Sequence, residues 1–225
     1  MDPSHFAPWT PTRHCRDVEL GRLSVPSGLL AIRDVYDLDH PQVVLAVPPG
    51  DHRVWATEFD IRSVHKTSDP LLRPAYLSVR VSNTVPVRVG SADALCCNNI
   101  PSPGASVRSD LGIIAVHDAE SVAATDMEGL DARWEAAWES TGDYADVRAE
   151  GGARVITCRT VRERTQLPLL ASFDAEDLPV AIHIDFGVVD TVGTDQLASD
   201  RWVAAARKLG TTAGRWFPWL FRRRR

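Results

Sequence analysis

Residues 53–64 read Arg-Val-Trp-Ala-Thr-Glu-Phe-Asp-Ile-Arg-Ser-Val, and their pattern decides the fold class. Trp55, Thr57, Phe59 and Ile61 fall at every second position, with charged residues between the last three. A period of two residues is typical of a β-strand that buries one face and exposes the other. The stretch therefore predicts a half-buried strand in a sheet with one solvated side.

Similar short stretches lie on both sides of this one. Residues 75–82 place Leu77, Val79 and Val81 on one side and polar residues on the other. Further strands are expected at 23–25, 29–33, 42–47, 111–116, 153–158, 167–173 and 180–186. Turn residues recur about every ten positions, which favours antiparallel sheets over alternating strands and helices. Pro48-Pro49-Gly50 predicts a hairpin-type reversal, and Pro86 places residues 85–89 at a sheet edge or a bulge.

Helical patterns are few and come after the middle of the chain. Residues 130–140 predict a helix, with Trp134 and Trp138 four positions apart on one face. Residues 91–97 predict a helical turn, and residues 195–209 predict a C-terminal helix. The expected fold class is mainly β or α+β, with sandwich-like antiparallel sheets, one or two inserted helices and a C-terminal helix.

The domain organisation follows from these elements. We expect an N-terminal arm at 1–18, a mainly-β domain at 19–190 and a helical extension at 191–225 that ends in a basic aromatic tail.

The 225 residues are 44% hydrophobic and 24% charged, which excludes disordered and fibrous classes for most of the chain. No stretch approaches the ~18 apolar residues of a membrane span, and no secretory pattern begins the sequence. The expected location is the cytoplasm.

The four cysteines are expected to be free thiols, because a reducing compartment disfavours disulfides. They are Cys15, Cys96, Cys97 and Cys158. Their spacing, like that of the seven histidines, does not match a zinc site. Cys158 is expected to pack beside Ile156 as a small hydrophobic residue. The sequence predicts no metal and no cofactor.

The best cluster of titratable residues surrounds residues 111–116. Asp110 precedes this strand and Asp118 follows it, next to His117. Two carboxylates can share acid and base roles only when the fold brings them within ~5–10 Å. The alternative reading places Asp110 in a turn and makes Asp118 the cap of a helix, with its carboxylate accepting from the amides that follow it. Phosphate-loop, dinucleotide-binding, nucleophile-elbow and zinc-protease motifs are missing.

Several turn motifs occur in an order that resembles a known family. Residues 21–28 end in a "PSG" turn, Asp34 follows, a "PPG" turn comes next, and Asp110, Gly112 and Asp118 lie in the middle. This order, over residues 19–187, resembles the bacterial domain of unknown function 4241 family. The motif residues are Pro26, Ser27, Gly28, Pro48, Pro49, Gly50, Gly112, Asp185 and Phe186. The chain departs from the family at 162–166, where relatives carry a "GDG" turn, and at Ile113-Ile114, where a glycine is usual.

The resemblance implies a mainly-β fold and a soluble bacterial protein of accessory or immunity type. A binding function is therefore the first hypothesis. The alternative is a small hydrolase-like or metal-dependent enzyme that uses Asp34, Asp110 or Asp118. Such an enzyme requires the three carboxylates to converge in one cleft.

The formal net charge of -5 hides a division along the chain. Residues 201–225 hold eight cations and no acid, while residues 1–200 hold 17 cations and 30 acids, a balance of -13. We expect the acidic body to recognise a basic, toxin-like protein partner. The aromatic and basic end is Trp216, Phe217, Trp219, Phe221, Arg222, Arg223, Arg224 and Arg225.

Three roles are open for this end of the chain. Its aromatic side chains either fold back on the domain, contact an anionic membrane surface or a partner, or stack on nucleic acid bases. Nucleic acid is the least favoured partner, because the acidic body repels phosphate.

Overall fold

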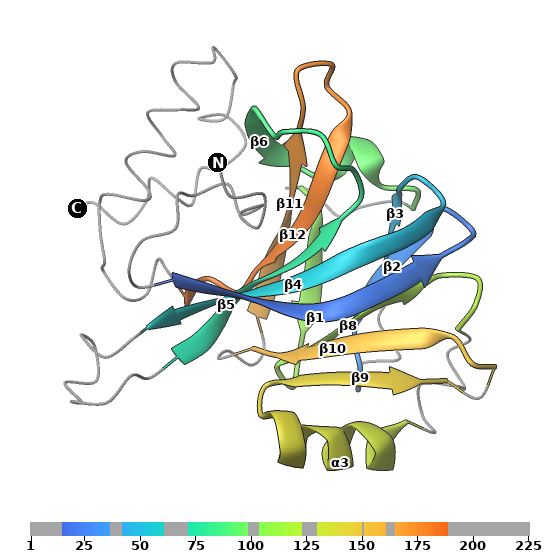
Figure 1. The fold of residues 1–225 in the computed structure, drawn as a ribbon, viewed down its shortest axis with the longest axis vertical. Coiled ribbons are helices and arrows are strands. Elements are labelled where there is room, and N and C mark those ends of the chain that lie inside the picture. Colours follow the sequence, from blue (N-terminus) through green and yellow to red (C-terminus); the bar gives the residue numbers. More distant parts are fainter. Residues whose placement is uncertain are drawn as a thin grey trace.

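The computed structural model describes residues 15–36, 42–60, 72–98, 104–122, 130–149, 151–160 and 165–188. Within these ranges the protein is mainly β, with two antiparallel sheets and one α-helix (Figure 1). The predicted fold class is thus confirmed for the sheets and the helix in the middle of the chain. The predicted C-terminal helix and the tail lie outside the described residues.

The first sheet has seven strands, six of them in the spatial order β1-β4-β5-β12-β11-β6, with β7 pairing to β11. Its strands are β1 (Cys15–Val25), β4 (Gly50–Asp60), β5 (Leu72–Arg80), β6 (Arg88–Ser91), β7 (Ser106–Ser109), β11 (Thr165–Phe173) and β12 (Pro179–Asp185). β6 is the last strand in this order and therefore lies at an edge of the sheet, as Pro86 predicted for residues 85–89. β1 begins at Cys15, four residues before the predicted start of the domain at residue 19.

The second sheet has five strands in the order β3-β2-β8-β10-β9. They are β2 (Leu29–Asp34), β3 (Val43–Ala46), β8 (Ile113–Asp118), β9 (Tyr144–Arg148) and β10 (Arg154–Arg159). The helix α3 (Asp131–Thr141) lies beside β9 (Figure 1), and a short 3-10 helix, η1, spans Asp93–Leu95. None of the described helices is long and apolar enough to cross a bilayer.

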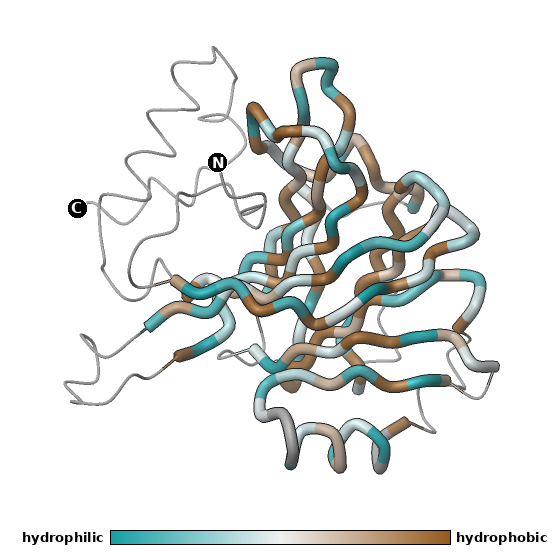
Figure 2. The backbone as a smooth tube through the Cα atoms, viewed as in Figure 1, coloured by the Kyte–Doolittle hydropathy of each residue, from teal (hydrophilic) through white to brown (hydrophobic). Residues whose placement is uncertain are grey.

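The core lies between the two sheets, as the alternation predicted. Leu77 and Val79 of β5 pack there with Ile114 and Val116 of β8. Cys158 is buried in the same cluster, as predicted. A second cluster forms where α3 covers the other face of the second sheet, with Trp134 and Trp138 buried against it. Hydrophobic and hydrophilic residues alternate along the strands in Figure 2, in keeping with this layered burial.

Two predictions about the long strand β4 were wrong. The reversal at residues 48–50 is no hairpin, because β3 belongs to the second sheet and β4 to the first, so the turn carries the chain between sheets. The alternation is also interrupted. Val54, not Trp55, packs in the core, and every residue from Ala56 to Asp60 is buried, so this part of the strand does not keep one solvated face.

The outer edge of β3 is covered by the segment that follows η1. The N–H of Cys97 donates to the carbonyl of Val44 (2.8 Å). The Asn98 side chain accepts from the N–H of Val44 (3.2 Å) and donates to the carbonyl of Gln42 (2.6 Å). Asn98 thus supplies with its amide the hydrogen bonds that another strand would supply.

Candidate functional site

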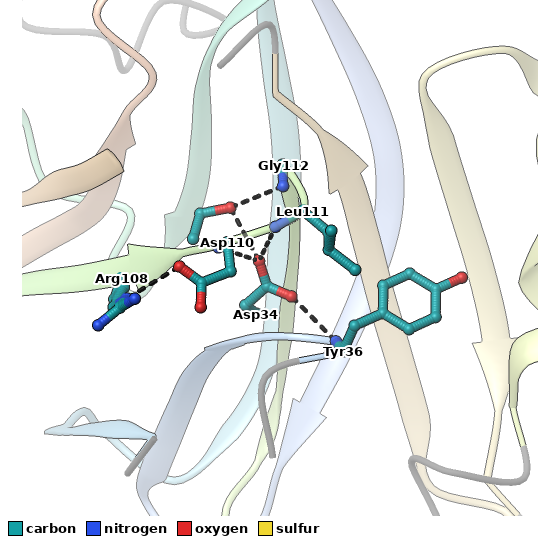
Figure 3. Close-up of polar contacts among 7 residues, drawn as sticks. Asp34, Tyr36, Arg108, Asp110, Leu111 and Gly112 are labelled. Atoms are coloured by element: carbon teal, nitrogen blue, oxygen red, sulfur yellow. Dashed lines mark hydrogen bonds and ion pairs between the residues drawn. The ribbon is translucent and has the colours of Figure 1, made fainter. Parts of the chain in front are cut away.

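The carboxylate of Asp34, at the end of β2, organises the turn between β7 and β8 (Figure 3). Its Oδ2 accepts from the hydroxyl of Ser109 (2.9 Å) and from the amides of Asp110 (2.9 Å) and Leu111 (3.2 Å). Its Oδ1 accepts from the amide of Tyr36 (2.9 Å). Asp34 and Ser109 are both buried. The Asp34 cluster, residues 34, 36 and 109–112, is therefore a closed network that fixes a turn.

Gly112 completes the Asp34 cluster. Its amide donates to the hydroxyl of Ser109 (3.0 Å), and its φ is 76°. This left-handed conformation favours glycine, because a Cβ is strained there. The position that the family resemblance singled out is thus explained by backbone geometry.

Asp110 lies in the turn, as one of the two sequence readings predicted, and its carboxylate points away from that of Asp34 (Figure 3). It is paired with Nε of Arg108 at 2.9 Å, in a partly exposed ion pair. The neighbouring Leu111 is 54% exposed. Asp110 and Arg108 are thus the accessible charged groups of this turn.

Asp118, at the far end of β8, holds two other turns. Its Oδ2 accepts from the amide (3.0 Å) and hydroxyl (2.6 Å) of Ser27, and its Oδ1 accepts from the amides of Glu120 and Ser121. The predicted acceptance from the amides after Asp118 is thus confirmed, but residues 119–121 form a turn and not the start of the predicted helix. Burial alone would raise the pKa of Asp118, but the hydrogen bonds from Ser27 and Ser121 outweigh it and hold the pKa below its ordinary value.

The two family-like turns meet beside Asp118. Gly28 has a φ of 73°, and a Cβ there would lie 3.0 Å from the carbonyl oxygen of Val47 and 3.3 Å from Pro49. The carbonyl of Gly28 in turn accepts from the amide of Val47 (2.9 Å). The "PSG" and "PPG" turns thus pack together at the crossing between the sheets. In the last of the family-like motifs, Asp185-Phe186, the carboxylate of Asp185 accepts from the amide of Gly187 (2.8 Å), and Phe186 is buried in the core.

Asp34 and Asp118 lie at opposite ends of one strand pair. In the register of β2 with β8, Asp34 pairs with Ile114 and Leu30 pairs with Asp118. Six residues of extended strand separate the Asp110 turn from Asp118 by roughly 20 Å. The described residues contain no group of three His, Cys, Asp or Glu side chains arranged to hold a metal ion. The geometry brings Asp34 to the Asp110 turn and leaves Asp118 apart.

His117 is buried on the side of β8 away from the core between the sheets. Its Nδ1 lies 2.9 Å from the carbonyl oxygen of Asp118, and among the described residues its Nε2 has no hydrogen-bond partner. Burial lowers the pKa of His117, and the charge of Arg33 adds to this lowering. The ring therefore stays neutral near neutral pH.

His183 forms a buried polar cluster that sequence reasoning did not single out. On β12, its Nδ1 lies 2.8 Å from the hydroxyl of Ser78 on β5, and its Nε2 lies 2.6 Å from that of Ser172 on β11. Burial lowers the pKa of His183 to about 3. A neutral ring has one donor and one acceptor nitrogen, so one hydroxyl donates to it and the other accepts from it. The only sequence signal is its position opposite the apolar face of β12.

The exposed apolar residues gather at one end of the first sheet. The loop 82–88 and the β11–β12 turn, residues 174–179, form this end, which we call the tip. Four large hydrophobic side chains are exposed among the described residues, and three of them belong to the tip: Val85 (66%), Val87 (55%) and Leu178 (60%). Single exposed apolar residues are common, whereas a group of them marks an interaction surface.

Hydrogen bonds hold the two halves of the tip together. The amide of Val87 donates to the carbonyl of Phe173 (2.8 Å), and Nε of Arg88 donates to Asp177 (2.8 Å). The Asp174 carboxylate accepts from the amides of Glu176 and Leu178. The tip is thus a braced surface, with Glu176 and Asp177 as its exposed acids.

Comparison with known proteins adds no relative. No family model matches the chain, and no curated protein and no solved structure matches it. The resemblance to the domain of unknown function 4241 family stays a prediction. The aromatic and basic residues 216–225, with the membrane contact expected of them, lie outside the described residues.

Proposed function

We propose that the protein acts by binding a basic protein partner, as an accessory or immunity-type protein, and that the tip is its contact surface. The observation that carries this proposal is the gathering of Val85, Val87 and Leu178 on one braced end of the first sheet. Interfaces with proteins combine an apolar centre with a polar rim. The tip has this composition on a small scale.

The acidic charge of the tip and of the chain favours a basic partner. Glu176 and Asp177 are exposed beside Leu178, and the chain carries a balance of -13 before residue 201. Acidic fields of this kind attract basic partners and speed their association, and salt screens the effect. Binding to the tip is therefore expected to weaken as ionic strength rises.

The frame of the tip supports binding without rearrangement. The amides of Val81 and Ser82 both donate to the carbonyl of Val180 (2.9 and 3.1 Å), and the guanidinium of Arg88 lies 3.9 Å from the centre of the Phe173 ring. A surface that is already ordered loses less conformational entropy on association. The two loops therefore present their apolar side chains in one arrangement.

The carboxylates support binding more than catalysis. Asp34 and Asp118 each accept four hydrogen bonds from donors of the protein itself. A general base needs a lone pair directed at the substrate. The oxygens of these two residues are directed at turns instead, and this arrangement does not favour the hydrolase alternative.

The proposal is tested by capture from a lysate of the source organism at low and high salt. The test variant is Val85→Ser with Leu178→Ser, and the control is Leu111→Ser, which removes an equally exposed leucine outside the tip. We expect wild type and control to retain the same basic protein at low salt, and the tip variant to retain at least tenfold less. Equal retention by all three proteins, or retention that does not respond to salt, overturns the proposal.

A further inference from the structure

The face of the first sheet that points away from the core, here called the outer face, is ordered in rows across the strands. Strand register defines each row, because directly paired residues point to the same side. The first row is Asp17, Thr57, Tyr76 and Asp185. The second row is Glu19, Trp55, Ser78, His183 and Leu170. The third row is Arg22, Arg53, Arg80, Ala181 and Ser172.

The middle of the outer face is buried. His183 and Ser172 are 0% exposed, Ser78 is 2% exposed, and Leu170 and Tyr76 are each 7% exposed. Antiparallel sheets often leave one face in water, and side chains on such a face are hydrated. The burial of these residues therefore requires a layer over β5, β12 and β11.

The described strands and helix do not form that layer. All described strands belong to the two sheets, and the second sheet occupies the opposite, inner face. The helix α3 packs on the second sheet. A further segment must therefore cover the outer face.

We propose that residues 189–225 of the same chain dock on the outer face, over β5, β12 and β11. The described chain reaches Val188 just beyond β12, which lies between β5 and β11 in the sheet. Phe186 and Val188 are buried in the core, so the chain leaves directly from this sheet. Ten extended residues span roughly 33 Å, so the segment is long enough to reach every strand of the face.

The composition of this segment suits the face. Trp216, Phe217, Trp219 and Phe221 supply the apolar area that the cover needs, and eight cations follow residue 200 with no acid among them. The first two rows of the face carry Asp17, Glu19 and Asp185, which attract these cations. Arg22 and Arg53 lie at the opposite end, outside the buried centre. Charge therefore favours seating the basic end near the first row.

His183 reports whether the cover is in place. Under the cover its pKa is about 3, because burial penalises the charged ring. With the cover removed, water reaches the ring and its pKa moves toward the ordinary 6.5. The titratable and charged residues of the three rows are Asp17, Glu19, Arg22, Arg53, Arg80, Tyr76 and Asp185.

The test follows the His183 imidazole by NMR in the full-length chain. The variant replaces Trp216, Phe217, Trp219 and Phe221 with Ser, and the control replaces Phe6 and Trp9, the aromatics at the other end of the chain. We expect His183 to titrate more than one pH unit higher in the tail variant, with the control unchanged. Amide exchange of Ile114 and Val116 verifies that the core remains folded.

Three outcomes overturn the proposal. If His183 titrates alike in wild type and tail variant while the core is intact, the tail does not cover the face. If the shift appears in the control instead, the N-terminal residues are the cover. In a second measurement, anionic phosphatidylserine vesicles are added to the full-length protein. If the protein floats with the vesicles and their addition does not change the pKa of His183, the aromatic residues sit in the membrane and not on the sheet.

Discussion

Asp34 and His183 are both buried polar side chains, but they are satisfied by different partners. Asp34 stands at a strand end and accepts three backbone amides and one hydroxyl. His183 stands in the middle of a sheet, and its two ring nitrogens bind side-chain hydroxyls. In mid-sheet the amides are already paired with neighbouring strands, whereas a turn leaves amides free.

The two cases show where each kind of buried polar residue is tolerated. A carboxylate accepts several hydrogen bonds at once, so it suits a turn with unpaired amides. A neutral histidine offers one donor and one acceptor, so two hydroxyls on the flanking strands satisfy it. Four experiments test this contrast, in order of decreasing effect.

Removing the carboxylate of Asp34 is expected to lower the free energy of unfolding more than the other changes do. Asp34→Ala leaves three amides and the Ser109 hydroxyl without their acceptor, and we expect a loss of about 4 kcal/mol in the free energy of unfolding, since each buried unsatisfied group costs ~1–3 kcal/mol. Urea denaturation measures the loss. Asp110→Ala, which removes a partly exposed ion pair, is the matched control and should change stability little. Similar losses in both variants would show that the Asp34 cluster is not a bracing network.

Lowering the pH is expected to destabilise the folded protein through His183. The folded pKa lies below the ordinary value, so the unfolded chain binds the proton first and stability falls as the pH drops below about 6.5. Between pH 7 and pH 5 this contribution amounts to about 2 kcal/mol. We expect His183→Leu to remove that part of the pH dependence, as measured by urea denaturation at both pH values. An unchanged pH dependence would mean that His183 is hydrated in the folded protein.

Truncating one hydroxyl partner of His183 is expected to have a smaller effect. Ser172→Ala removes the hydroxyl that binds Nε2 of the buried ring, at a cost of about 1.5 kcal/mol. Ser106→Ala is the control, because its hydroxyl bonds the exposed Gln166. Thermal unfolding distinguishes the two variants. A loss no greater in Ser172→Ala than in the control would argue that water replaces the missing hydroxyl.

The backbone of the Asp34 turn is expected to show the smallest effect. Gly112→Ala places a Cβ at a φ of 76° and should cost about 1 kcal/mol. Gly151 is the matched control, because its φ is not in the left-handed region and a Cβ there meets no atom within 4 Å. We expect Gly151→Ala to leave the melting temperature unchanged or slightly higher. If the two variants melt together, the turn relaxes without strain.

The sequence was most informative where local chemistry decides the structure. Alternation at Leu77 and Val79 predicted the core face of β5 correctly, and the spacing of Trp134 and Trp138 predicted the buried side of α3. The acceptance by Asp118 from the amides after it followed from the residues next to it. Each of these signals lies within a few positions of the residue concerned.

Features that depend on distant pairing were not predictable. Ser27 and Asp118 are 91 positions apart, and Ser78 and His183 are 105 apart, so no local pattern links them. Residues 48–50 predicted that the chain reverses, but they did not predict which sheet the next strand joins. The tip also needed the fold, because strand pairing brings Val87 and Leu178 to the same end.

The amide of Asn98 has a consequence for the protein in concentrated solution. An edge strand with free N–H and C=O groups is a template on which a strand of another molecule can pair. At β3 the Asn98 side chain binds the amide of Val44 and the carbonyl of Gln42, and the amide of Cys97 binds the carbonyl of Val44. These contacts protect this end of the second sheet against strand exchange between molecules, and so against the first step of fibrous aggregation.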